Sequence, residues 1–367
     1  MECRDFGKTG LKPSILGFGM MRLKKNDDGT LDEKWAIDTL RYAIDRGLSY
    51  VDTAYAYGDS ERVTGLCLQD GYREKVTLAS KMPVRLMKCE EDFDRILNEQ
   101  LERLQTDCID VYLLHALNRD TWDSYIDKFH VLEHAEKAKA EGKIKHLGFS
   151  FHDTLDSFRY ILNAYDKWEF CQIQLNYMDV NYQAGITGLK EAHERGLAVV
   201  IMEPLRGGNL VNVPEDVAKL LPGNPVESAL DFLWNMPEVN VVLSGMSETQ
   251  QVVDNLTYAD RAYAGMLTQQ QVSDAIAAGD IMRQRMLTPC TGCNYCNVCP
   301  QGIAIPEIFA LQNDRHITGD HVTATKAYQA LVDRNASKCV SCGACVEQCP
   351  QNIDIPKKIA SIHKWYV

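Results

Sequence analysis

The sequence is short of positive charge and has no long apolar segment. Its 367 residues contain 39 Lys and Arg against 51 Asp and Glu, which gives a net charge of −12. Because nucleic-acid-binding proteins carry a basic surface, this balance argues against a nucleic-acid partner. No stretch reaches 18 consecutive apolar residues, so neither a transmembrane helix nor a membrane partner is expected. The N-terminal segment MECRDFGKTGLKP also lacks the apolar core of a secretory signal.

The missing signal bears on the 13 cysteines of the chain. Disulfides belong to oxidising compartments, and a chain of this length without a signal is not expected to hold a disulfide framework. We therefore expect a cytoplasmic, reducing location. Five of the cysteines are scattered, whereas the other eight form two dense runs near the C-terminus.

A third absence concerns glycine and decides the fold class. Eight apolar, β-branched runs alternate with helix-like segments, which is the count and length of a (β/α)₈ barrel, and their near-continuous apolar character is typical of a parallel sheet. An open doubly wound sheet would instead need a Gly-rich fingerprint after its first strand. The segment GFGMMR at 17–22 lacks the third glycine and no helix follows it, so the sequence favours the barrel. The strand-like runs are 14–20, 50–54, 76–82, 109–115, 144–150, 170–176, 198–204 and 239–246.

Amphipathic segments between these runs predict the helices. Residues 91–105 and 123–143 are two clear examples. Gly47, Gly142 and Gly196 each stand where a helix would stop.

The domain organisation has three parts. Residues 1–265 form the barrel, residues 266–287 a connecting helix, and residues 288–367 a cysteine-rich domain. In the last part, CPQGIAIPEI at 299–308 matches CPQNIDIPKK at 349–358, which indicates an internal duplication with a period of 49–50 residues. Each half is too short to hold a core of its own, so we expect the two halves to fold together around metal.

The eight clustered cysteines follow the bacterial ferredoxin pattern C-x₂-C-x₂-C with a later C-P. In that pattern three thiolates of one run and the last cysteine of the other run hold each [4Fe–4S] cluster. The first run departs from it, with two residues rather than three before its C-P. The predicted ligands are Cys290, Cys293, Cys296 and Cys349 for one cluster and Cys339, Cys342, Cys345 and Cys299 for the other.

Zinc is the alternative metal, because pairs of C-x₂-C also hold zinc. Three cysteines at two-residue gaps followed by C-P favour iron and sulfur instead. The segments PEIFALQN and HVTATKAYQALVD between the runs look helical. The domain is therefore expected to be a mainly helical dicluster ferredoxin-like unit.

Polar residues with complementary chemistry stand at the ends of three neighbouring strand-like runs. Asp52 ends the second run, Tyr57 lies in the loop after it, Lys81 ends the third and His115 ends the fourth. The C-terminal ends of barrel strands carry the active site, so these side chains should converge. A phenol, with a pKa of about 10, becomes a better acid near neutrality when an ammonium lowers that pKa. The set predicts proton donation by Tyr57 to an oxygen that His115 also binds, and a hydride donor is implied.

The motifs DTAYAYG, SK, LLH and GFS, in this order, resemble the aldo-keto reductase family over residues 3–262. The resemblance implies a TIM-barrel oxidoreductase that uses NADP(H) or NAD(H) on a small carbonyl or alcohol substrate. It makes Asp52, Tyr57, Lys81 and His115 the catalytic tetrad, with Tyr57 as the general acid and base.

The same resemblance places the cofactor. Ser150 and Gln172 contact the nicotinamide, Phe151 stands where the family usually has Asn, and Met202 replaces an aromatic that the family often stacks on the ring. The 2′-phosphate arginine aligns with the uncharged Gln251, so NADP against NAD stays open. The expected contacts are Gly19, Met20, Met21, Asp52, Ser150, Gln172, Met202, Glu203, Leu205, Gly207, Ser244, Gly245, Met246, Ser247, Gln251 and Asn255.

The cofactor phosphates are expected at the start of a helix after the last strand. Such barrels bind phosphate near strands 7 and 8 and a helix N-terminus. In LSGMSETQQVVDNL at 243–256, Ser247 can cap that helix, with Gln250 three residues on as in a capping box. By the resemblance, Asn255 contacts the adenine.

Three functions remain open at this point. Hydride transfer needs no iron, so the clusters of a reductase would be structural or redox-sensing. Alternatively, the clusters exchange electrons with a substrate or a redox partner protein, which the negative charge of the chain would steer if the partner is basic. In the third case, the chain binds nicotinamide cofactor as a regulatory partner without catalysis.

Overall fold

The computed structural model describes residues 1–318 and 320–366, and their contacts divide the chain into two compact units. The first unit comprises residues 1–204 and 229–268. The second comprises residues 205–228 and those from 269 onward. A segment in the middle of the barrel sequence therefore packs with the cysteine-rich region, which the sequence did not indicate.

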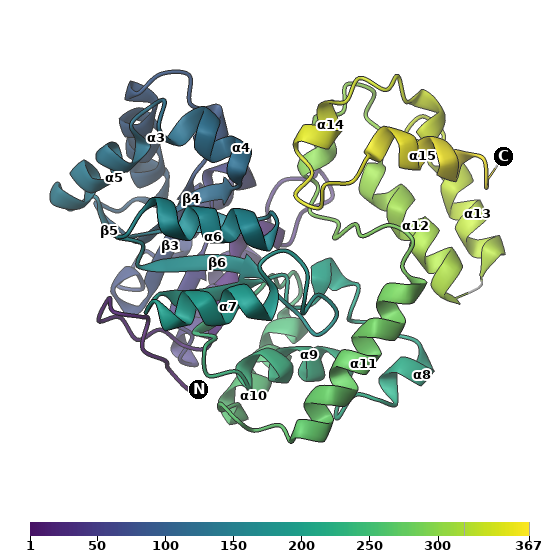
Figure 1. The fold of residues 1–367 in the computed structure, drawn as a ribbon, viewed down its shortest axis with the longest axis horizontal. Coiled ribbons are helices and arrows are strands. Elements are labelled where there is room, and N and C mark those ends of the chain that lie inside the picture. The colour runs from purple at the N-terminus through teal and green to yellow at the C-terminus, as the bar shows by residue number, and fades with distance from the viewer. Residues whose placement is uncertain (319, 367) are drawn as a thin grey trace. The chain divides into compact units, whose positions relative to one another are not determined.

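The first unit contains a closed barrel of eight parallel strands, as the sequence predicted (Figure 1). Each strand pairs with its sequence neighbours, and β1 closes the barrel against β8. Every one of the predicted runs overlaps a strand, and β4 and β5 extend one or two residues beyond the predicted ends. They are β1 Leu16–Gly19, β2 Tyr50–Asp52, β3 Thr77–Met82, β4 Ile109–Leu117, β5 Ile144–Phe151, β6 Phe170–Gln174, β7 Ala198–Met202 and β8 Val241–Ser244.

The barrel interior is filled by apolar side chains and closed at one end by Phe6. Phe6 is fully buried and its ring centroid lies 5.9 Å from that of Tyr50 and 5.4 Å from that of Phe170. Tyr50 and Phe170 are the first residues of β2 and β6, so this plug marks the N-terminal ends of the strands. The chemistry must therefore come from the opposite, C-terminal ends.

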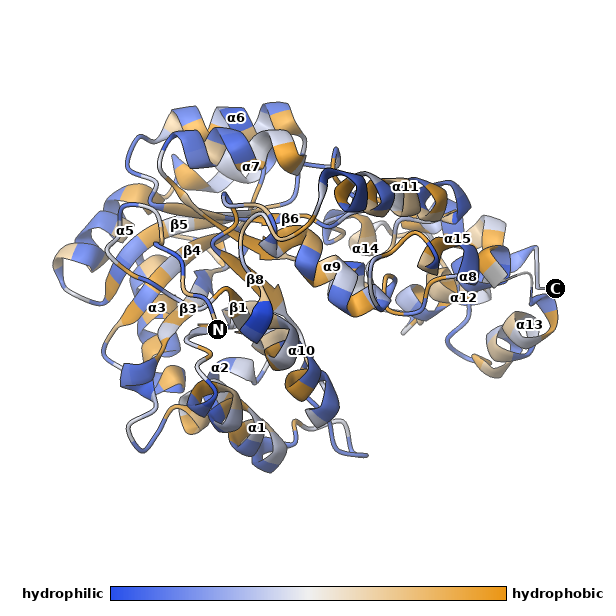
Figure 2. Ribbon diagram, turned by 90° about the horizontal axis from the view of Figure 1, so that it is seen from below, coloured by the Kyte–Doolittle hydropathy of each residue, from blue (hydrophilic) through white to orange (hydrophobic). Residues whose placement is uncertain are grey.

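Helices surround the strands, and Figure 2 shows the strands mostly in the hydrophobic colour while the helices are banded with polar residues. This is the distribution expected of amphipathic helices that cover a buried sheet. The helices are α1 Glu33–Asp45, α2 Ser60–Cys67, α3 Glu91–Leu104, α4 Arg119–Thr121, α5 Val131–Ala140, α6 Leu155–Ala164, α7 Gly185–Glu194, α9 Pro225–Trp234 and α10 Thr249–Arg261. The shorter turns are η1 Met20–Arg22, η2 Tyr55–Tyr57, η3 Arg73–Lys75, η4 Val84–Leu86 and the π-helical η5 Trp122–Ile126.

Two expectations about helices meet different outcomes. The stop glycines are confirmed, because Gly47, Gly142 and Gly196 have φ of +96°, +76° and +80° just after α1, α5 and α7. The single helix over 123–143 is wrong. His130 has a left-handed φ of +45° there, which separates η5 from α5 and interrupts the helical hydrogen bonding.

The second unit is mainly helical, as expected. Figure 1 shows its later helices in green to yellow, and α12 packs against both α13 and α15. Tyr328 and Tyr366 stack in its core with ring centroids 4.4 Å apart. Its elements are η6 Arg206–Gly208, α8 Glu215–Ala218, α11 Gln269–Arg285, η7 Tyr295–Val298, α12 Ile305–Thr318, α13 His321–Ala330, η8 Ala336–Lys338, α14 Ala344–Glu347 and α15 Ile355–His363.

The duplication is visible in the backbone of this unit. Gly292 and Ser341 occupy equivalent places, have φ of +63° and +54°, and each donates its N–H to the sulfur two residues earlier at 3.4 Å. The helices α12 and α15 begin at the equivalent residues Ile305 and Ile355, both buried in one shared core. The two halves thus complete each other, which agrees with the expectation that neither holds a core alone.

None of the helices within the described residues combines the length and the apolar character that a membrane crossing requires.

Candidate functional site

The four residues expected to do chemistry lie at the C-terminal ends of β2, β3 and β4. Asp52 ends β2, and Tyr57 ends the turn η2 that follows it. Lys81 lies one residue before the end of β3, and His115 lies within β4, which continues for two further residues. The parallel pairing of these neighbouring strands sets all four side chains at one end of the barrel.

Lys81 and Asp52 form a buried ion pair. The Nζ of Lys81 lies 2.6 Å from Oδ1 of Asp52 and 2.8 Å from the carbonyl oxygen of Thr53, and both charged side chains are almost completely buried. Burial raises the pKa of Asp52, and the Lys81 ammonium opposes this effect. Each group is thus the main electrostatic partner of the other, which fixes the ammonium in one place.

Tyr57 lies close to both this ion pair and His115. The Nζ of Lys81 lies 4.8 Å from the centroid of the Tyr57 ring, and the His115 ring meets the Tyr57 ring edge to face at 6.0 Å. A cation this close to a phenol stabilises its ionised form. The structure thus brings the four predicted residues together.

The surroundings of His115 favour its neutral form. Burial lowers its pKa well below the ordinary value, and the charges of Lys81 and His152 lower it further. Burial also lowers the pKa of His152 to about 4. His152 was missed by the sequence analysis, although it stands two residues after Ser150 in GFSFH and lies close enough to His115 to influence its pKa.

Two side chains near this site can hold a carboxamide. The hydroxyl oxygen of Ser150 accepts the N–H of Ala116 at 2.8 Å, which leaves its proton to donate. Gln172 contacts the sulfur of Met202 at 3.6 Å through Nε2, and its buried Oε1 has no hydrogen-bond partner. A carboxamide offers both an acceptor and a donor, so this pair fits the expected nicotinamide. Phe151 is instead fully buried in the core.

The residues expected to hold the cofactor phosphates lie where β1 and β8 end. A methyl group on Gly19 would lie 3.4 Å from the carbonyl oxygen of Ser244. A methyl group on Gly245 would likewise lie 3.4 Å from the side chain of Arg22. Small residues thus keep this space open, and Arg22 adds a positive charge beside it, which the sequence analysis did not single out.

The helix after β8 differs from the expectation. The helix α10 begins at Thr249 with Glu248 at its N-cap and without a side-chain cap, so the Ser247 capping box is wrong. The N–H of Ser247, one of the expected cofactor contacts, donates to Oε1 of Gln251 at 2.9 Å. The side chain of Gln251 thus reaches back to the Ser247 N–H and competes with the capping arrangement that was expected for Ser247.

The remaining expected cofactor residues are distributed over both units. Asn255 donates from Nδ2 to the Ser244 hydroxyl at 2.9 Å and is buried. Met20 is buried in η1, with Met21 beside it, and Met246 is buried in the loop after β8. Glu203 follows β7 in the first unit.

Leu205 and Gly207 belong to the second unit. Gly207 has a left-handed φ of +68° within η6.

The eight clustered cysteines divide into two sets around two cavities. One cavity is lined by Cys290, Cys293, Cys296 and Cys349, together with apolar residues such as Ile305 and Phe309. The other is lined by Cys299, Cys339, Cys342 and Cys345, together with Ile303 and Ile359. Each set takes three thiols from one run and the last thiol from the other run, which is the crossing arrangement that the sequence suggested.

The thiols are close enough to influence each other. Burial raises the pKa of Cys296 to about 12, and Cys293, Cys290 and Cys349 add to this rise. Burial also raises the pKa of Cys345, and the other three thiols of its own set, Cys299, Cys339 and Cys342, add to this rise. Within residues 1–318 and 320–366, no three His, Cys, Asp or Glu side chains are grouped closely enough to hold a single metal ion. The donors are those that iron–sulfur clusters use, so the cavities fit such clusters.

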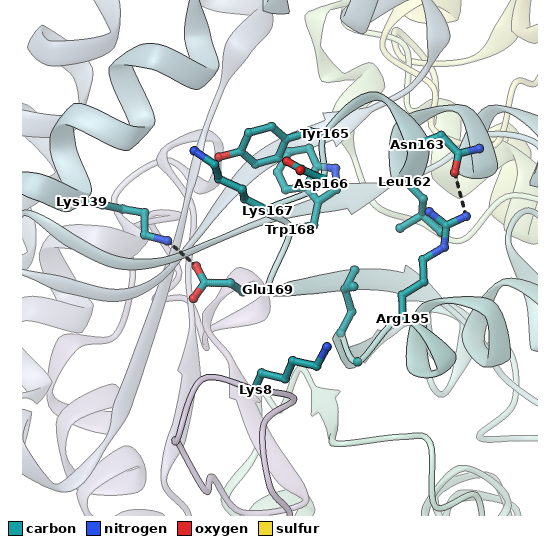
Figure 3. Close-up of a pocket in the computed structure, with 12 residues that line it drawn as sticks. Lys8, Lys139, Leu162, Asn163, Tyr165, Asp166, Lys167, Trp168, Glu169 and Arg195 are labelled. Atoms are coloured by element: carbon teal, nitrogen blue, oxygen red, sulfur yellow. Dashed lines mark hydrogen bonds and ion pairs between the residues drawn. The ribbon is translucent and has the colours of Figure 1, made fainter.

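A further hollow of about 630 Å³ lies at the other end of the barrel (Figure 3). It is lined by Trp168 and Glu169 just before β6 and by Gly196 and Leu197 just before β7. These are the N-terminal ends of the strands, away from the tetrad. Figure 3 shows Glu169 paired with Lys139, so much of the charge in this hollow is already matched.

Comparison with known proteins agrees with this geometry. The profile of the Aldo/keto reductase family matches residues 15–216, and the profile of a 4Fe-4S dicluster domain matches residues 289–353. Aldo-keto reductase YhdN of Bacillus subtilis (strain 168) is 32% identical over 172 residues, which are 43% of this chain and half of that protein.

Solved structures share the barrel. Aldo-keto reductase AKR11C1 from Bacillus halodurans, in its holo form, superposes with a TM-score of 0.64 at 26% identity, covering 76% of this chain and 96% of that one. An aldo-keto reductase from Klebsiella pneumoniae in complex with NADPH gives 0.63 at 23% identity over 76% and 95% of the two chains. The second likeness shows the fold alone.

Proposed function

We propose that this chain, which belongs to the aldo/keto reductase family, transfers hydride between NADP(H) or NAD(H) and a small carbonyl or alcohol substrate. The observation that supports this most directly is the buried Lys81–Asp52 pair beside the ring of Tyr57. Such a pair keeps a positive charge next to a phenol in a site with little water, where it acts most strongly on the phenol.

Each residue of the tetrad has one task in this proposal. Tyr57 gives its phenolic proton to the carbonyl oxygen of the substrate, and the ammonium of Lys81 stabilises the phenolate that remains. Asp52 holds Lys81 in position. The neutral ring of His115 has one N–H to donate to the same oxygen, which favours negative charge there. In the reverse direction the Tyr57 phenolate accepts the proton of an alcohol.

The nicotinamide cofactor supplies or accepts the hydride when bound. We propose that Ser150 and Gln172 orient its carboxamide, because one has a free proton to donate and the other a buried acceptor without a partner. Together with the space at Gly19 and Gly245, these residues would fix which face of the ring meets the substrate.

We further propose that the cysteine cavities hold two [4Fe–4S] clusters, whose role in this reaction is to maintain the second unit. The division of the thiols between the cavities supports the crossed ligand sets. Cys349→Ala should remove iron from the first cavity and Cys299→Ala from the second. Electron paramagnetic resonance of the reduced variants would distinguish the remaining cluster, and loss of the same signal in both variants would contradict the crossing.

The reaction is tested by a carbonyl and alcohol screen with both nicotinamides on protein purified without oxygen. Tyr57→Phe should lower the rate of carbonyl reduction by about 10²–10⁴-fold, because it removes the proton donor. Tyr55→Phe is the matched control, since the Tyr55 hydroxyl binds Glu99 outside the tetrad. An undiminished rate in Tyr57→Phe would exclude Tyr57 as the acid. Tight cofactor binding without turnover would instead indicate a regulatory partner.

A second function, electron exchange by the clusters, is favoured by the exposure of the second cysteine run. Cys342 is exposed, and the neighbouring Val340 has 62% of its surface exposed. A cluster held there would lie near the surface, within reach of a redox partner. Residues 288–367 hold seven Lys and Arg and six Asp and Glu, so the negative charge of the chain lies elsewhere and would not steer a basic partner to this surface.

Anaerobic mixing with NADPH or NADH separates the two functions. Electron exchange requires that the clusters become paramagnetic when cofactor or substrate is added. If they stay unchanged during carbonyl turnover, electron exchange is not part of the reaction.

A further inference from the structure

The two cysteine runs have the same sequence pattern but different surroundings. Thr291, the second residue of the first run, is 2% exposed, whereas its equivalent Val340 in the second run is 62% exposed. Within the part of the chain that the structure describes, a segment covers the start of the first run, whereas Val340 at the start of the second run has no such cover. The covering segment belongs to the same compact unit and is the loop that follows β7, residues 205–228.

Contact between this loop and the first run is made backbone to backbone. A methyl group on Gly207 would lie 1.7 Å from the carbonyl oxygen of Thr291 and 2.6 Å from its carbonyl carbon. No residue with a side chain fits at position 207 unless the backbone moves. Thr291 also lines the cavity formed by the first thiol set. A single residue thus contacts both the loop and that cavity.

Neighbouring contacts hold the loop in the same place. Asn209 donates from Nδ2 to the carbonyl oxygen of Cys290 at 3.0 Å. Arg206 is 2% exposed and donates from Nη1 to the sulfur of Met286 at 2.9 Å. Further along the loop, Asp216 receives two hydrogen bonds from Arg285.

The backbone of the loop does not prefer this conformation by itself. Arg206, Gly207 and Gly208 are consecutive and have φ of +50°, +68° and +103°. A left-handed φ at a residue such as Arg206 costs energy and persists only where the surroundings impose it. Here the surroundings are Met286, which lies shortly before the first cysteine run, and Cys290 and Thr291, which begin that run.

We propose that the first cysteine run, closed around its cluster, positions the loop after β7, with Asn209 and Thr291 as the positioning residues. The second run has no such role. Cys290 supplies both a predicted cluster ligand and the carbonyl that Asn209 binds, so loss of the first cluster releases the loop.

The test compares full-length variants that each lose one cluster. Cys293→Ala removes a ligand of the first set and Cys342→Ala the equivalent ligand of the second. Hydrogen exchange of residues 205–210 should become at least about tenfold faster in Cys293→Ala and stay unchanged in Cys342→Ala, because exchange reports local opening. Iron analysis confirms which variant has lost metal, and unchanged exchange in β4 confirms that the barrel is folded.

A second pair of variants leaves both clusters in place. Gly207→Ala clashes with Thr291, whereas Gly208→Ala has no atom within 4 Å of its new methyl group although its φ is equally unsuited to alanine. Faster exchange of the loop is expected in Gly207→Ala only. Asn209→Ala should speed exchange about fivefold, the value of one hydrogen bond, and Asn212→Ala, an exposed residue of the same loop, should not.

The outcomes separate this proposal from the proposed function. Equal exchange in Cys293→Ala and Cys342→Ala, or equal effects of Gly207→Ala and Gly208→Ala, would overturn it whether or not the protein binds cofactor.

Discussion

The two units of this chain place their reactive side chains on different kinds of support. In the first unit, Asp52, Lys81 and His115 belong to strands of a closed barrel whose core is complete without any ligand. In the second unit, six of the eight clustered cysteines lie outside helices and the other two, Cys296 and Cys345, lie in the short elements η7 and α14. All eight line two cavities, and a thin core of isoleucines and aromatics connects the duplicated halves. The barrel therefore holds a site, whereas the second unit is built around one.

The difference has a thermodynamic meaning. A site on barrel strands is pre-formed by backbone hydrogen bonds that do not involve the reactive groups. Cysteines on loops become ordered only when metal binds, so the free energy of binding is also free energy of folding. The same chain should consequently respond to metal loss in one part and not in the other.

Removal of iron is expected to have the largest effect, and it tests the difference between the two units most directly. Incubation with a chelator under reducing conditions should abolish protection from hydrogen exchange in α12, α13 and α15, because their core closes over the cysteine cavities. Strands β1 to β8 should keep their protection. Loss of protection in the strands as well would show that the barrel also depends on the clusters.

Substitution of Lys81 tests the barrel side of the comparison. Lys81→Met leaves the Asp52 carboxylate buried without its partner, which should lower the free energy of unfolding of the barrel by about 3–5 kcal/mol. Adding Asp52→Asn should restore most of this stability without restoring carbonyl reduction. Denaturant titration followed by tryptophan fluorescence and the reduction rate give the two readouts, and the cluster absorbance should stay unchanged throughout. A fully active Lys81→Met would contradict the role given to the ammonium.

Acid should weaken the barrel through its buried histidines. The pKa of His152 is lowered to about 4, and that of His115 is also lowered, so the unfolded chain binds protons at a pH where the folded chain does not. Their contribution to stability is present above pH ~6.5 and is lost as the pH falls toward 4, by roughly 1–3 kcal/mol. His152→Gln should reduce this loss and His193→Gln, an exposed control, should not. Denaturation midpoints between pH 7 and pH 4.5 provide the measurement.

The smallest effect is expected at the exposed second run. Val340→Ser should change the stability of the second unit by less than about 0.5 kcal/mol, because Val340 is mostly exposed. Thermal unfolding followed by the visible absorbance of the clusters would show it. A loss above 1 kcal/mol would mean that Val340 is covered in solution, and the contrast with Thr291 would then disappear.

Most of the fold could be predicted from the sequence because its signals are local. Eight apolar runs separated by amphipathic segments were enough for the barrel, and the stop glycines were correct because a left-handed turn strongly favours glycine. The segment 123–143 shows where this reasoning fails. Its apolar spacing is helical throughout, but His130 takes a left-handed conformation that no local signal announces.

The candidate site could also be predicted only in part. The tetrad was found because its members stand at or near strand ends, and parallel pairing brings strand ends together. His152 was missed because its proximity to His115 depends on where β5 ends relative to β4. Arg22 was missed for a similar reason, since its neighbour Gly245 is more than 200 residues away in the sequence.

By itself the sequence determined the family, the barrel and the duplicated cysteine pattern, because each is written in residue types at fixed spacing. Only the tertiary structure decided which copy of that pattern is covered. The two runs are near-identical in pattern, yet Thr291 is in contact with Gly207, 84 positions before it, and Val340 is exposed. Contact between such distant segments depends on how the chain packs, and spacing within a motif carries no information about it.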